Sequence, residues 1–142
     1  MATRWHDIQA DFVDGNGLPA TDNIGNGRIH SVAVRAGWRP LAGLRLDLGY
    51  VFNDGRVTDP APLFAAAFAR ASLAQIPNVA RHAARGSVDY TRALSDSVDL
   101  RIAALVQYIG RSRVGIGPIL GGDQGDYLDS SLTLRIGKPD LG

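Results

Sequence analysis

The fold of this chain is decided by the stretch Leu44-Arg45-Leu46-Asp47-Leu48-Gly49-Tyr50-Val51-Phe52, in which apolar and polar side chains alternate. One face carries Leu44, Leu46, Leu48, Tyr50 and Phe52, and the other carries Arg45, Asp47 and Gly49. Successive side chains of a β-strand point to opposite faces, so a period of two predicts a strand with one apolar and one polar face.

The same alternation recurs along the 142 residues. It predicts six strands, near residues 4–13, 28–39, 44–53, 80–92, 98–111 and 127–137. One-sided alternation is typical of antiparallel sheets whose two faces meet different surroundings. We therefore expect an all-β fold, an antiparallel up-and-down meander of about six long strands that forms a partial transmembrane β-barrel.

The amino-acid composition favours strands over helices and excludes several classes of function. The chain has 14 acidic residues, all Asp, and its 15 basic residues include one lysine, Lys138. Helical soluble domains use Glu and Lys heavily, so a helix-rich protein is disfavoured. A net charge of +1 gives no case for nucleic acid, and the absence of cysteine excludes disulfides and thiol catalysis.

The connections between the expected strands alternate in length. Pro40–Gly43 and Ala93–Ser97 are tight turns, whereas 14–27, 53–78 and 112–126 are long and rich in Gly, Asp, Asn and Pro. Short turns at one end and long loops at the other are characteristic of transmembrane β-barrels. One short helix, Pro62–Ala74, is expected in the second long loop, packed over the barrel mouth or closing over a ligand.

Aromatic residues lie near the strand ends, at the levels where a transmembrane barrel meets the two membrane interfaces. Five lie on the apolar faces near the strand ends: Trp38, Tyr50, Phe52, Tyr90 and Tyr108. Aliphatic residues fill the space between them, as in the girdles of outer-membrane barrels. Residues 44–52, at about 3.4 Å each and tilted by about 40°, cover roughly 23 Å, close to the apolar band of about 25 Å.

The polar faces supply candidate ligand-contacting residues that would line a lumen. These are Arg35, Arg45, Asp47, Arg85, Arg101, Gln107, Arg111 and Arg135. The surplus of arginine favours anionic ligands, although a solvated wall that pairs with a plug domain is the plainer interpretation.

No arrangement of residues indicates catalysis, a metal or a cofactor, so we expect a protein that is not an enzyme. His6, His30 and His82 are not spaced as a metal pair. Asp123, Asp126 and Asp129 lack the glutamate of a calcium loop, and turn chemistry explains that segment.

Several short stretches, in this order, resemble the C-terminal part of the barrel of TonB-dependent outer-membrane receptors. They are Arg4-Trp5-His6-Asp7-Ile8-Gln9, Asn23-Ile24-Gly25-Asn26-Gly27-Arg28-Ile29, Trp38-Arg39-Pro40-Leu41-Ala42-Gly43-Leu44, Thr58-Asp59-Pro60, Ile76-Pro77-Asn78-Val79-Ala80-Arg81 and Tyr108-Ile109-Gly110-Arg111-Ser112. Such receptors carry a plug inside a barrel of about 22 strands. They import ferric siderophores or other scarce nutrients with energy relayed by TonB.

The resemblance implies a receptor fragment in the outer membrane that does not transport alone. Its partners would be the rest of the barrel and the plug, the TonB system through that plug, and lipid. The chain itself shows no plug and no signal peptide. The alternative is a soluble antiparallel β-domain that binds a partner through its long loops, and a third possibility is a decayed gene product without a function.

Overall fold

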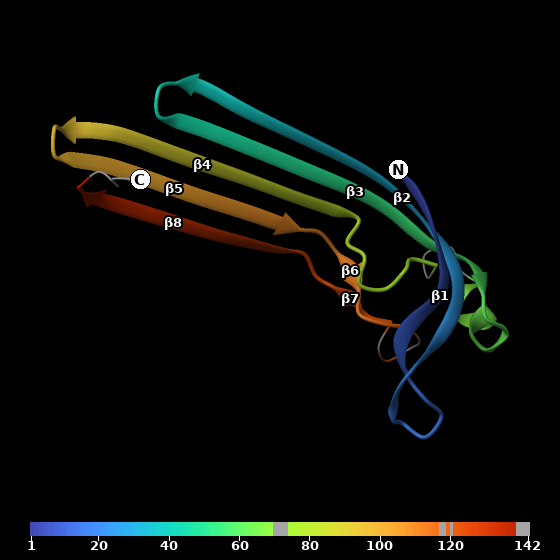
Figure 1. The fold of residues 1–142 in the computed structure, drawn as a ribbon. Coiled ribbons are helices and arrows are strands. Elements are labelled where there is room, and N and C mark those ends of the chain that lie inside the picture. Colours follow the sequence, from blue (N-terminus) through green and yellow to red (C-terminus); the bar gives the residue numbers. More distant parts are fainter. Residues whose placement is uncertain (70–73, 117–118, 120, 139–142) are drawn as a thin grey trace. The chain divides into compact units, whose positions relative to one another are not determined.

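The computed structural model describes residues 1–69, 74–116, 119 and 121–138. Figure 1 shows the order of the elements along the chain. They are β1 (Ala2–Val13), β2 (Pro19–Leu41), β3 (Leu44–Pro60), the 3-10 helix η1 (Pro62–Phe68), β4 (His82–Ser95), β5 (Val98–Ile109), β6 (Ser112–Arg113), β7 (Asp123–Gln124) and β8 (Tyr127–Gly137).

Six strands form one sheet in the order β1-β2-β3-β4-β5-β8, and β6 and β7 form a separate small ladder. Neighbours in the large sheet follow the order of the chain, which confirms the predicted all-β meander with one short helix. β4, β5 and β8 pair in an antiparallel sense, and Ala104 lies opposite both Val88 and Leu132. The alternating faces of the sequence are thereby aligned from strand to strand.

The chain divides into two compact units. Unit 1 comprises Met1–Val32, Val51–His82 and Gly110–Asp126. It contains every buried apolar residue of the part of the chain that the structure describes: Ile8, Ala10, Ile24, Val57, Phe64, Phe68, Ile76 and Ile116. The rings of Phe12 and Phe64 meet edge to face, 5.1 Å apart, so η1 packs against β1 in this core.

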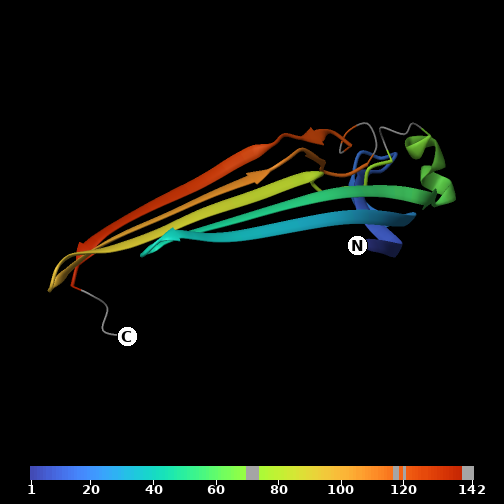
Figure 2. The ribbon, with the colours of Figure 1, turned by 90° about the horizontal axis from the view of Figure 1, so that it is seen from above.

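Unit 2 comprises Ala33–Tyr50, Ala83–Ile109 and Tyr127–Gly142. Figures 1 and 2 show its strands as a single layer. None of its described residues is buried. Its apolar face exposes ten large side chains: Val34, Trp38, Leu48, Tyr50, Val88, Val106, Leu128, Leu132, Leu134 and Ile136. Within unit 2, therefore, no second layer of this chain covers the face that the sequence marks as apolar.

Several strands are longer than the sequence predicts. The expected long loop 14–27 is wrong, because β2 begins at Pro19 and leaves only a short turn after β1. Likewise, β3 continues to Pro60 rather than ending near residue 53. Glycine and asparagine in these segments resemble loop residues, yet Gly25 sits within β2 at a φ of +119°. A conformation of this kind is readily adopted by glycine, so the strand continues through it.

Other boundaries differ by a few residues. The expected helix is shorter, because η1 ends at Phe68, and residues 70–73 lie outside the described residues. Pro62 favours the first turn, since proline needs no hydrogen-bond acceptor there. β4 runs to Ser95 and β5 stops at Ile109, whereas the sequence predicted ends near 92 and 111.

Among the described residues, no helix has both the length and the apolar character needed to cross a membrane.

Candidate functional site

The polar face of unit 2 is the part of the molecule where charged side chains gather. Strand alternation places six arginines and four aspartates there: Arg35, Arg39, Arg45, Arg85, Arg101, Arg135, Asp47, Asp89, Asp99 and Asp129. The face therefore carries more positive than negative charge among the described residues.

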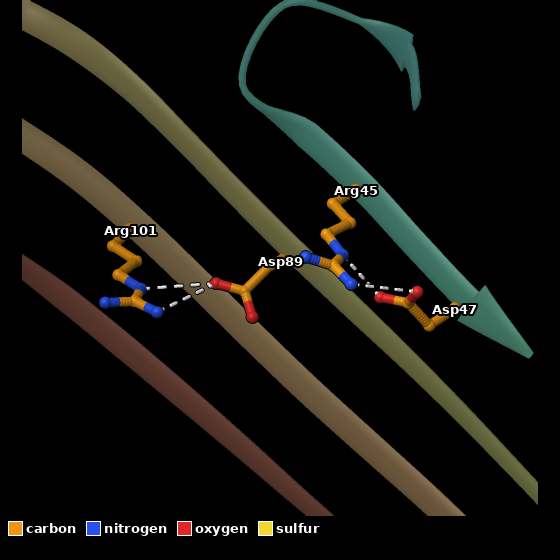
Figure 3. A network of polar contacts seen from close by, with 4 residues as sticks. All are labelled: Arg45, Asp47, Asp89 and Arg101. Atoms are coloured by element: carbon orange, nitrogen blue, oxygen red, sulfur yellow. Dashed lines mark hydrogen bonds and ion pairs between the residues drawn. The ribbon is translucent and has the colours of Figure 1, made fainter. Parts of the chain in front are cut away.

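Two ion pairs organise the middle of this face. The Arg45 Nε and Nη2 atoms donate to the two carboxylate oxygens of Asp47, at 2.7 and 3.2 Å. Arg101 donates through Nε and Nη2 to Oδ1 of Asp89, at 3.2 and 3.0 Å. Figure 3 shows the four side chains as a row of alternating charge across β5, β4 and β3.

Strand geometry explains both pairs. Arg45 and Asp47 lie two residues apart on β3, so their side chains leave the same face. Asp89 lies opposite Ala103 and Arg101 lies opposite Thr91, which makes Arg101 and Asp89 diagonal neighbours across β4 and β5. All four side chains are about half exposed. Exposed pairs contribute about 0–1 kcal/mol each, so the row orders the guanidinium groups more than it stabilises the sheet.

The other predicted contact residues take separate places on this face. Gln107 lies opposite Arg85 on one side and Asp129 on the other. Arg35 lies exposed on β2. Arg101 and Arg135 face each other across β5 and β8. The latter two line a pocket of about 200 Å³ with Thr91, Asp99, Gly137 and Lys138.

Four of these pocket residues were not predicted as site residues: Thr91, Asp99, Gly137 and Lys138. Thr91, Asp99 and Lys138 come from three separate segments, and only the register of β4, β5 and β8 brings them to Arg101 and Arg135. Asp89 already pairs with Arg101, so the two arginines and the lysine stand against Asp99 and Asp89, and the small positive excess that remains favours an anion such as a carboxylate or phosphate.

Arg111 lies beyond the strands of unit 2 that carry the other predicted residues. β5 ends at Ile109, and Arg111 belongs to unit 1, where its Nε lies 3.6 Å from a carboxylate oxygen of Asp126. The backbone N–H of Gly110 donates to the carbonyl of His82 at 2.7 Å, which closes the pairing of the two chain segments here. A side chain at residue 110 would collide with His82, so glycine allows the chain to leave the strand.

The predicted girdle residues lie in both units. Trp38 and Tyr50 are 65% and 42% exposed on unit 2. Tyr90 lies opposite Ile102, and Tyr108 lies opposite Ala84, so β4 and β5 hold them at different levels of the sheet. Phe52 belongs to unit 1, where its ring lies 5.3 Å from that of His82.

Unit 1 has a charged cluster of its own around Asp54. Its Oδ1 accepts from Arg56 Nε at 3.0 Å and from Arg81 Nη2 at 3.5 Å. These guanidinium groups, Arg56 foremost, hold the pKa of Asp54 below its ordinary value of 3.8. The ionised carboxylate of Asp54 therefore links β3 to the segment just before β4.

The three histidines belong to unit 1 and lie in β1, in β2 and at the start of β4. In the described part of the chain, no three histidine, aspartate or other metal-ligating side chains gather in a group suited to a metal ion.

Comparison with models of protein families, with curated proteins and with solved structures finds no match to this chain.

Proposed function

We propose that this chain is part of the wall of an outer-membrane β-barrel, a segment of a TonB-dependent receptor whose parent imports a ferric siderophore or another scarce nutrient. In this proposal unit 2 spans the membrane, its apolar face meets lipid and its polar face lines the lumen. The proposed assignment to the receptor family rests on the sequence motifs described above. The membrane role rests on the exposed apolar face of unit 2.

Energetics favour lipid against that face. Burying a large apolar side chain yields about 1.5–3 kcal/mol. Ten such side chains lie exposed on unit 2. These side chains are partly exposed, so leaving them in water forfeits an amount comparable to the roughly 5–15 kcal/mol by which a whole domain is usually stable. A soluble monomer also rarely exposes a continuous apolar patch of this kind. The alternative, a soluble binding module, requires a cover for this face.

The edges of the sheet favour a larger barrel. β8 pairs with β5 in an uninterrupted register from Asp99–Gly137 to Ile109–Tyr127, and it is the last strand of the sheet. No bulge interrupts this edge, whereas β1 at the opposite edge has register shifts next to Ile8. Open strand edges cannot face lipid, so in a membrane β8 requires a further strand. The remainder of a receptor barrel provides one.

The polar face suits a lumen that admits anions. Arg45 and Arg101 are held by Asp47 and Asp89. Beyond these two ion pairs, the face still carries more arginines than aspartates. Fixed guanidinium groups bind carboxylates and phosphates with paired hydrogen bonds. In the parent receptor this surface would contact either acidic groups of the plug or an anionic nutrient complex.

The membrane role can be tested by light scattering of the purified chain in plain buffer and in nonionic detergent. We expect association in buffer and a uniform particle in detergent, because detergent covers the apolar face. Replacing Leu132 and Leu134 together by serine reduces association in buffer, whereas replacing Ser131 and Thr133 by alanine does not. A uniform monomer in buffer, with Leu46, Leu48 and Leu134 protected from solvent labelling, would contradict the proposal.

A further inference from the structure

A pocket of unit 1 lies between its first two strands, β1 and β2. It has a volume of about 220 Å³ and is lined by Ala2, Thr3, Arg4, Arg28 and His30. Arg4 lies directly opposite Arg28, and Ala2 lies opposite His30. Strand alternation therefore places both guanidinium groups and the imidazole on one face, and the small side chain of Ala2 leaves space among them.

This face points away from the hydrophobic core of unit 1. Ile29, which separates the two pocket residues of β2, packs against that core. A Cβ on Gly27 would likewise lie 2.7 Å from Cδ1 of Ile8, a core residue. Arg28 and His30 therefore leave the opposite face of β2 and are exposed, so a solute can reach them.

The two arginines, which we call the arginine pair, are an unfavourable combination in a sheet. Like charges directly opposite each other repel across Cβ atoms about 4.5–5.5 Å apart. In the part of the chain that the structure describes, no ion pair joins Arg4 or Arg28 to a carboxylate. An anion held between the two guanidinium groups turns this repulsion into two attractions.

Acidic side chains do not compensate the arginine pair. None lines the pocket. On the neighbouring strand β3, Asp54 is already engaged by the guanidinium groups of Arg56 and Arg81, so that cluster adds a net positive charge. The pocket of unit 2 differs in this respect, because Asp99 is part of its lining and Arg101 is held by a carboxylate.

The chemistry of the arginine pair suits a phosphate group better than a carboxylate. One guanidinium fork already satisfies both oxygens of a carboxylate, whose single charge leaves the second arginine uncompensated. A phosphate monoester has three free oxygens and a charge of about −1.5 to −2 at pH 7, which matches two arginines. The imidazole of His30, two residues along the same face of β2, supplies a further N–H donor.

We propose that the arginine pair and His30 form a binding site for a phosphate monoester group, each guanidinium fork and the imidazole N–H donating to its oxygens. Two kinds of molecule supply this chemistry: a soluble phosphate ester, and a phospholipid whose headgroup is a phosphate monoester. The inference rests on residues of unit 1 alone and does not depend on the proposed membrane function.

Titration of glycerol phosphate, followed by phosphorus NMR, tests the site on the full chain in nonionic detergent. We expect saturable binding of one phosphate ester per chain. Arg4→Gln and Arg28→Gln should each weaken binding at least about tenfold, because hydrogen bonds between charged groups are lost. Arg28→Lys keeps the charge without the fork and should also bind more weakly than the wild type. Both arginines are exposed, so these variants should leave the fold intact.

Arg92→Gln is the matched control. Arg92 is an exposed arginine of β4, opposite Leu100 and outside the pocket lining. Its replacement removes the same charge and should leave binding unchanged. Absence of saturable binding to the wild type, or equal weakening in Arg92→Gln, would overturn the site. Acetate that binds as tightly as glycerol phosphate would overturn the assignment to a phosphate.

Flotation with phosphatidylcholine vesicles, with and without phosphatidic acid, distinguishes the two sources of the phosphate. Phosphatidic acid has a phosphate monoester as its headgroup. If it raises flotation of the wild type and Arg92→Gln but not of Arg28→Gln, the pocket binds a lipid headgroup. If it raises none of them while glycerol phosphate still binds, the ligand is a soluble ester. An equal rise in Arg28→Gln would refute a headgroup in this pocket.

The same experiment keeps the two proposals of this article separate. Failure of every protein to float with plain phosphatidylcholine contradicts the proposed membrane function, whereas the titration with glycerol phosphate decides the pocket by itself.

Discussion

Replacing Leu132 by arginine is expected to lower the stability of the chain in a lipid bilayer by about 2–4 kcal/mol, the usual cost of a lipid-facing arginine near the midplane. Leu132 lies opposite Ala104, between the levels of Tyr108 and Tyr90. Its side chain is 74% exposed, so in water the same substitution removes almost no packing. Denaturant titration of the chain in phospholipid vesicles measures the effect.

Thr133→Arg is the control for this experiment. Thr133 is the next residue of β8 and lies on the opposite face, opposite Ala103. An arginine there joins a polar surface and should change stability by no more than about 0.5 kcal/mol. If Thr133→Arg is the more harmful of the two changes, the assignment of the faces is incorrect.

Gly25→Ala is expected to destabilise unit 1 by about 2–6 kcal/mol. The added Cβ would lie 2.2 Å from the carbonyl oxygen of Asp59 and 2.7 Å from the backbone nitrogen of Ala61. The φ of +119° at Gly25 adds strain for any residue with a side chain. Each of these two effects typically costs about 1–3 kcal/mol.

Hydrogen exchange at the Ala61 amide reports this loss directly, because that N–H donates to the carbonyl of Ile24 at 2.9 Å. We expect exchange to accelerate at least thirtyfold, the factor that about 2 kcal/mol gives. Gly15→Ala serves as the control, since a Cβ at Gly15 meets nothing within 4 Å. Unchanged exchange in Gly25→Ala would show that β2 and the end of β3 do not approach each other as described.

The strands of unit 2 were predictable because their periodicity is local. Alternation over residues 44–52 and 98–108 is sufficient to identify β3 and β5, and the end of β8 agrees with its expected bound. The start of β2 was not predictable in this way. Asn23 and Asn26 read as loop residues, yet their amide groups donate to Asp7 and Asp59 and hold the segment in the sheet.

The core of unit 1 was also beyond a local pattern. Ile24, Ile76 and Ile116 stand as single apolar residues in segments without periodicity, and they meet only when three distant parts of the chain come together. Of the two ion pairs on the polar face, likewise, one could be identified from the sequence and the other could not. Arg45 and Asp47 were identifiable on one face of one strand, whereas pairing of Arg101 with Asp89 depends on the register of β4 and β5.

The contact between lipid and the apolar face of unit 2 is tested most directly by a spin-label scan of β8 in phospholipid vesicles. The chain contains no cysteine, so each single-cysteine variant from residue 128 to 136 carries one label. We expect collisions with oxygen, which concentrates in lipid, to peak at the even positions. Collisions with a water-soluble nickel chelate should peak at the odd positions. Even positions as accessible to the chelate as the odd ones, or shielded from both reagents, would contradict a lipid-facing sheet.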